Sequence, residues 1–191
     1  MNKLIKLRQM GFSIPWKLIL MGRHFPEAAP EPLGRAEIVT YLMTLLEGSA
    51  DPALEAQAIS LLCAAEDGDA FDRQLQRLAQ DDPADEALQR RKWCAYFLAQ
   101  ILEAEIQDPV QGLLELLFFW CNIGCSARCP HDLMEKLSPE TFFCDSNYQH
   151  VLAQNRVWLQ KEIAEILLQE GRSTATVRGR SAAVRKREFY E

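Results

Sequence analysis

The sequence has no run of about 20 apolar residues, the length that a membrane-spanning helix needs. It has no alternating β-branched run bounded by turns, so a sheet is not expected. The strings G-x-x-x-x-G-K, G-x-G-x-x-G, G-x-S-x-G and H-E-x-x-H do not occur. The common nucleotide-binding and hydrolase signatures are therefore absent, and we expect no catalytic machinery and no cofactor.

Cysteine and histidine are scarce, with six and three residues. So few cysteines exclude a disulfide miniprotein, and free thiols in a reducing cytoplasm are expected. Bases within residues 3–8 precede an apolar stretch, as in a signal peptide, but Ser13, Pro15 and Lys17 interrupt that stretch. We therefore expect a cytoplasmic protein.

The chain has 191 residues, of which 48% are hydrophobic and 25% charged, values near the averages of globular proteins. A chain of this length buries roughly 70% of its unfolded surface. It therefore holds a core without disulfides or metals and forms one domain, or at most two.

Charge is segregated along the chain. Residues 1–24 hold five bases and no acid, and residues 172–191 hold six bases and two acids. Residues 25–171 hold ten bases and twenty-five acids, so an acidic body lies between two basic ends. An acidic body attracts basic proteins and repels nucleic acid, although acidic surfaces also serve solubility alone.

Apolar residues recur at helical spacing through most of the chain, which predicts an all-α fold. The predicted helices centre on residues 38–46, 54–65, 71–79, 94–102, 113–121 and 152–167, and an N-terminal helix is expected within residues 12–22. Gly48, Gly68 and Gly171 are predicted helix ends. The 113–121 segment is apolar nearly all round, which predicts a central helix covered on several sides. Its aromatics Phe118, Phe119 and Trp120 are expected in the core, with Trp93 and Trp158.

Four helix starts share an N-cap residue followed by proline, whose missing N–H costs nothing at the first helical position. They are Asp51-Pro52, Asp82-Pro83, Asp108-Pro109 and Ser138-Pro139, and Asp69 is the predicted N-cap of 71–79. Residues 51–56 (DPALEA) and 82–87 (DPADEA) are near copies. The pattern indicates stacked antiparallel helices, of the HEAT-like α-solenoid type, although good capping alone explains it equally.

The predicted organisation is an all-helical domain at 1–171 with a Pro-rich connection at 25–34, followed by a basic tail at 172–191. The tail lacks periodicity and is expected to be flexible or to order on a partner. Its arginines could contact RNA phosphates while Phe189 and Tyr190 stack on bases, or it could fold back on the acidic body.

The sharpest local pattern is Cys121, Cys125 and Cys129, followed by His131. Thiolates and imidazole are zinc ligands, so these four residues are the alternative metal or redox site. The spacing matches no structural zinc or iron–sulfur pattern, and apolar thiols at a helix end explain it as well. Cys–His nucleophilic catalysis would require a geometry that sequence proximity does not establish.

Acidic residues gather at predicted helix starts and turns, where they complement the helix dipole. The candidate partner contacts are Glu47, Asp51, Glu55, Glu66, Asp67, Asp69, Asp81, Asp82, Asp85 and Glu86. A catalytic carboxylate pair would need burial and a perturbed pKa, which nothing in the sequence demands.

Residues 12–16 (FSIPW) with 19–22 (ILMG), and residues 158–163 (WLQKEI), resemble a family of small bacterial all-helical proteins encoded beside polymorphic or contact-dependent toxins. The resemblance implies an immunity protein that inhibits by binding. We therefore expect a non-enzymatic binding protein whose acids cover the basic active site of a toxin, such as a nuclease domain. The alternatives are a helical-repeat adaptor and a thiol or zinc protein.

Overall fold

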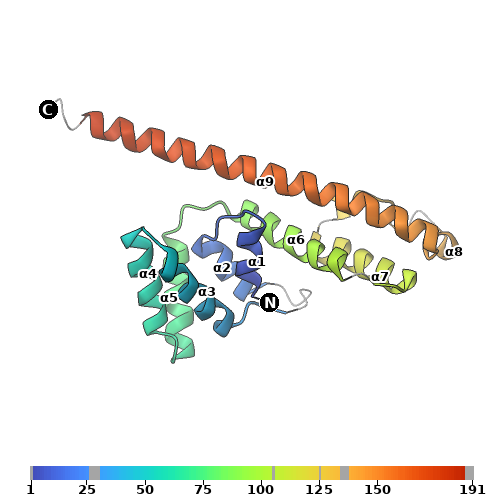
Figure 1. Cartoon of the computed structure of the whole chain (residues 1–191), viewed down its shortest axis with the longest axis horizontal. Coiled ribbons are helices and arrows are strands. Elements are labelled where there is room, and N and C mark those ends of the chain that lie inside the picture. The colour runs from blue at the N-terminus through green and yellow to red at the C-terminus, as the bar shows by residue number, and fades with distance from the viewer. Residues whose placement is uncertain (1, 26–30, 105, 125, 134–137, 188–191) are drawn as a thin grey trace.

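The computed structural model describes residues 2–25, 31–104, 106–124, 126–133 and 138–187, and helices dominate these ranges (Figure 1). The α-helices are α1 (Lys3–Gln9), α2 (Trp16–Arg23), α3 (Arg35–Gly48), α4 (Pro52–Cys63), α5 (Gly68–Gln80), α6 (Glu86–Glu103), α7 (Pro109–Phe119), α8 (Pro139–Phe142) and α9 (Asp145–Arg187). A π-helical turn, η1 (Trp120–Gly124), and a 3-10 turn, η2 (Ser126–Arg128), follow α7. With no strand in the described ranges, the predicted all-α class is confirmed. None of the helices described has the length and apolar character required to cross a membrane.

Three of the predicted N-caps are confirmed. Asp51 accepts the amides of Ala53 and Leu54, and Asp108 and Ser138 cap α7 and α8 in the same way. Each is followed by a proline, whose fixed φ suits the first turn. Gly48 is the last residue of α3, as predicted.

Two other caps and one helix end differ from the prediction. The N-cap of α6 is Asp85, not Asp82, because α6 begins only at Glu86; the Asp82 carboxylate accepts the backbone amides of Lys17 at 3.1 Å and Ala84 at 2.9 Å. The N-cap of α5 is Asp67, not Asp69. Gly68 is therefore the first residue of α5 rather than the end of the preceding helix, which stops at Cys63.

The central helix is α6, not the predicted 113–121 segment. Every residue from Lys92 to Ala99 is buried, because α6 packs against α1, α2, α7 and α9. Trp93 donates its indole N–H to the carbonyl of Leu18 in α2 at 2.9 Å. Gly22 makes this close approach possible, since a Cβ at that position would collide with the Trp93 ring.

One face of α7 is open to solvent, contrary to the prediction that it is covered on several sides. Leu113, Leu116 and Phe119 are fully buried, as predicted for the core. Phe118 is 50% exposed and Leu114 is 47% exposed, so the prediction that Phe118 is a core residue is wrong. A helix that is apolar all round can be buried on any face. Which face is buried depends on where the neighbouring helices pack, and the sequence of the helix itself does not show this.

Ion pairs attach α9 to the rest of the molecule, along which it lies in Figure 1. Arg91 of α6 binds Glu162 at 2.7 Å and Glu165 at 3.0 Å. The fully buried Lys92 binds Glu170 at 2.6 Å and donates to the backbone carbonyl of Ser13 at 2.9 Å. Burial lowers the pKa of Lys92, and Glu170 opposes that shift.

The predicted helix end at Gly171 is wrong, because α9 continues through it to Arg187. Glycine inside a helix costs only about 1 kcal/mol, and a glycine stop requires a positive φ that Gly171 lacks. For residues 172–187 only the backbone is described, so a separate basic tail at 172–191 stays a prediction. Residues 26–30 of the predicted connection lie outside the described residues.

Candidate functional site

The ten acids predicted to contact a partner lie at or within one turn of the connections between α3, α4, α5 and α6. Because α4 and α5 pack together and a short connection joins them, the start of α4 and the end of α5 lie at the same end of the pair. Glu66, Asp67 and Asp69 lie at the opposite end. The twelve residues of α4 separate the two ends by about 18 Å.

Four of these acids already serve the fold. Asp51, Asp67 and Asp85 are N-caps, and Asp82 accepts two backbone amides. A capping carboxylate is held by backbone N–H groups, and its removal typically costs about 1 kcal/mol. Mutating any of these four residues would therefore also destabilise the fold. They are poor positions at which to test contact with a partner.

The other six form no hydrogen bond or ion pair through their carboxylates with any described residue. They are Glu47, Glu55, Glu66, Asp69, Asp81 and Glu86, and we call them the unpaired acids. Several acids elsewhere are paired, since Glu37, Glu103 and Glu162 each bind a lysine or arginine, although Glu115 and Glu140 form no ion pair with a described residue. The α3–α6 connections therefore carry a concentration of unpaired acidic charge.

The cysteine cluster is only partly assembled. Cys129 Sγ lies 3.3 Å from His131 Nδ1, whereas Cys121 is exposed on η1 and Cys125 lies outside the described residues. Across the described ranges, no three His, Cys, Asp or Glu side chains lie close enough together to hold a metal ion. A zinc site there stays a prediction, because it would need Cys125.

A hydrogen bond from Asn155 of α9 fixes which ring nitrogen of His131 carries the proton. Asn155 Oδ1 accepts the indole N–H of Trp120 at 2.8 Å, so its Nδ2 faces His131 Nδ1 at 3.1 Å. Nδ2 can only donate, and Nδ1 therefore accepts, which places the imidazole proton on Nε2. Burial lowers the pKa of His131 to about 4, against the opposing charge of Asp132.

This geometry does not activate the thiol. The Nδ1 lone pair is occupied by Asn155, and Cys129 Sγ donates to the backbone carbonyl of His131 at 3.3 Å. A nucleophilic cysteine needs a base with a free lone pair, or a charged imidazolium beside it. The arrangement instead supplies buried hydrogen bonds that connect the segment after α7 to α9.

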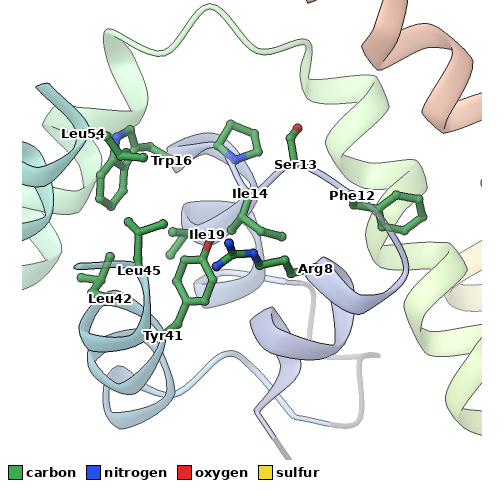
Figure 2. Close-up of a pocket in the computed structure, with 11 residues that line it drawn as sticks. Arg8, Phe12, Ser13, Ile14, Trp16, Ile19, Tyr41, Leu42, Leu45 and Leu54 are labelled. Carbon is green, nitrogen blue, oxygen red and sulfur yellow. The ribbon is translucent and has the colours of Figure 1, made fainter. Parts of the chain in front are cut away.

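A pocket of about 380 Å³ opens between α1, α2, α3 and α4 (Figure 2). Its walls are mostly apolar and include Ile14, Trp16, Ile19, Leu42, Leu45 and Leu54. Trp16 donates its indole N–H to Gln57 of α4 at 2.7 Å, which fixes the ring at the wall. The size lies within the range of small-molecule sites.

Three polar side chains line this pocket: Ser13, whose hydroxyl already binds Glu170 and Lys92, and Arg8 and Tyr41, whose guanidinium and hydroxyl point toward one another in Figure 2. Burial raises the pKa of Tyr41, with the charge of Arg8 opposing the rise, so the hydroxyl is protonated at neutral pH. Sequence reasoning missed both residues. Arg8 counted only as N-terminal charge, and α1, which places it, was not predicted.

No protein-family model, curated protein or solved structure matches the chain. The resemblance of residues 12–22 and 158–163 to immunity proteins therefore stays an expectation. Three features of the structure bear on function: the unpaired acids, the Cys129–His131–Asn155 hydrogen bonds and the pocket beside Arg8 and Tyr41.

Proposed function

We propose that this protein acts without catalysis by binding a basic protein partner, as a cytoplasmic immunity protein that neutralises a bacterial toxin. The unpaired acids carry the proposal. They lie within residues 35–86, where twelve acids face three bases and leave a net charge of −9. A concentrated field of one sign raises the association rate with a partner of opposite charge.

The favoured contact is the end of the α4–α5 pair that includes the last turn of α3. Glu47, Glu55, Asp81 and Glu86 bring four of the six unpaired acids to this end. The active site of a nuclease toxin is basic because it binds phosphate, so an acidic surface of this kind would cover it. Charge complementarity is the one observation that supports a nuclease toxin as the partner.

A helical-repeat adaptor is the second candidate. Helices α3, α4 and α5 pack on one another in chain order, as stacked HEAT-like hairpins would. This arrangement supports a scaffold whose partner is a cellular protein rather than a toxin. The thiol or zinc alternative has less support because Asn155 occupies His131 Nδ1, and one zinc per purified chain in elemental analysis would revive it.

The proposal predicts one stoichiometric basic partner. The tagged full-length protein would be captured from its native host and washed at low and at high salt, and the retained proteins identified by mass spectrometry. A basic partner that leaves as salt rises, and whose toxicity the protein suppresses, supports the immunity function. A non-toxic cellular protein that survives high salt favours the adaptor.

Charge reversal then tests the contact surface. Glu47→Lys with Asp81→Lys should slow association with the captured partner about tenfold or more and flatten its salt dependence. Both positions lie at helix C-termini, where lysine suits the helix dipole, so stability is preserved. Association rates would be measured by surface plasmon resonance across ionic strengths.

The matched control is Glu115→Lys with Glu140→Lys, which changes the net charge equally at exposed acids on α7 and α8. This variant should slow association far less. Equal effects of the two double variants would show that net charge, not this surface, governs binding. Unchanged rates in both would end the electrostatic version of the proposal.

A further inference from the structure

We propose that the pocket between α1, α2, α3 and α4 binds a small molecule that carries an apolar chain and a single carboxylate. This site is separate from the unpaired acids and is independent of the proposed function. It combines an apolar cavity of about 380 Å³ with the Arg8 cation and the Tyr41 hydroxyl, whereas the Ser13 hydroxyl at its wall is already bound to Glu170 and Lys92. Each of these properties constrains the ligand.

The cation selects an anionic head group. Arg8 forms no ion pair with any acid in the described ranges, although other bases of the N-terminal segment do: Lys3 binds Glu37, Lys6 binds Glu103 and Arg23 binds Asp72. A guanidinium offers parallel N–H donors that match the two oxygens of a carboxylate. Arg8 is thus a free anion-binding group at the pocket.

The tyrosine adds a second donor. Tyr41 is 4% exposed, and its hydroxyl has no hydrogen-bond partner among the described residues. The hydroxyl oxygen itself is not a buried unsatisfied atom but reaches the open pocket, so a ligand oxygen there can accept a hydrogen bond from it. In Figure 2 the hydroxyl lies beside the Arg8 guanidinium, so one carboxylate can accept from both groups.

The apolar walls of the pocket favour an uncharged, apolar chain for the rest of the ligand. Trp16, Ile19 and Leu45 are among the side chains that give the pocket its apolar lining, and none of them offers a second charge. Each methylene buried there should improve affinity by about fourfold. Medium-chain fatty acids have the required chemistry, and decanoate is the probe that we would use.

Binding of decanoate to the purified full-length protein would be measured by calorimetry, below the micelle concentration. We expect saturable binding, weaker binding of octanoate, and at least tenfold weaker binding of decanol, which lacks the charge. Trp16 lines the pocket and should report binding as a change in its fluorescence, so Trp16→Phe should remove that change. A fluorescence change that survives this variant would place the ligand elsewhere.

Variants test the two polar groups. Arg8→Gln should weaken decanoate at least tenfold and leave decanol unchanged, because the Arg8 side chain is exposed and does not support the core. Tyr41→Phe should weaken decanoate about threefold to fivefold. The control Arg73→Gln removes an exposed arginine of α5 outside this pocket and should have no effect.

Three results would overturn the proposal: no saturable binding, equal affinity for decanoate and decanol, or equal behaviour of the Arg8 and Arg73 variants. Capture of a toxin or of an adaptor partner bears on none of these results. The ligand site and the proposed protein-binding function can therefore fail separately.

Discussion

His131 shows how a single buried residue can make stability depend on pH. Its pKa is about 4 in the folded protein, because burial disfavours the charged ring, whereas an unfolded histidine titrates near 6.5. The unfolded chain therefore binds more protons between these values. The stabilisation is complete above about pH 6.5 and is lost as the pH falls toward 4.

We expect the free energy of unfolding to decrease by on the order of 1–2 kcal/mol between pH 7 and pH 5 through His131 alone. Urea denaturation at both pH values measures this change. His131→Gln should reduce the decrease by that amount, while His150→Gln, at an exposed position on α9, should leave it unchanged. Identical decreases in all three proteins would mean that His131 is not the source.

Of the contacts around His131, sequence spacing predicts the one with Cys129 but cannot predict those made through Asn155. Cys129 and His131 are two residues apart, so their proximity follows from the chain. Trp120 and Asn155 are 35 residues apart, and their hydrogen bond depends on how α9 lies against η1. Arg8 and Tyr41 were missed for the same reason, because α1 and α3 must pack before their side chains meet.

At the scale of one element, α7 distinguishes two adjacent phenylalanines. Phe119 is fully buried and Phe118 is 50% exposed. Phe119→Ala should lower the free energy of unfolding by about 3–5 kcal/mol, since it removes core contacts and leaves a cavity. Phe118→Ala should cost about 1 kcal/mol or less, because half of its surface already meets water.

Urea denaturation of the two variants at constant pH measures this difference. The substitutions are chemically identical and lie on the same helix, so helix propensity is matched between them. Comparable losses would indicate that another surface covers Phe118 in solution. That result would restore the sequence-based prediction that α7 is buried on several sides.

The helices could be predicted individually because their signals are local. Asp51, Asp108 and Ser138 cap helices as expected, since each needs only the amides of the next turn. Asp82 is not the cap of α6, which begins four residues later at Glu86, and one oxygen of its carboxylate accepts the amide of Lys17, 65 residues away, a contact that no local pattern indicates. The α9 helix passed Gly171 because one glycine is too weak a signal to end a long helix.

At the scale of the whole molecule, buried ion pairs decide how α9 lies on α6, and no local pattern indicates them. Glu162 is 3% exposed and binds both Arg91 and Arg128, whereas the Glu165 side chain is 62% exposed and binds Arg91 at the surface. Burial raises the pKa of Glu162, but the two arginines outweigh it and hold that pKa below its usual value. Glu162 is therefore ionised at neutral pH and compensates two cations.

Glu162→Gln should lower the free energy of unfolding by about 3 kcal/mol, because it leaves Arg91 and Arg128 without the carboxylate that they share. Glu165→Gln, which removes an exposed partner of the same arginine, should cost less than about 1 kcal/mol. Urea denaturation at neutral pH measures both values, and added salt should reduce only the smaller one. If the two variants lost equal stability, the buried carboxylate would not be what holds α9 against the central helix, and the apolar contacts of Ile166 and its neighbours would carry that role instead.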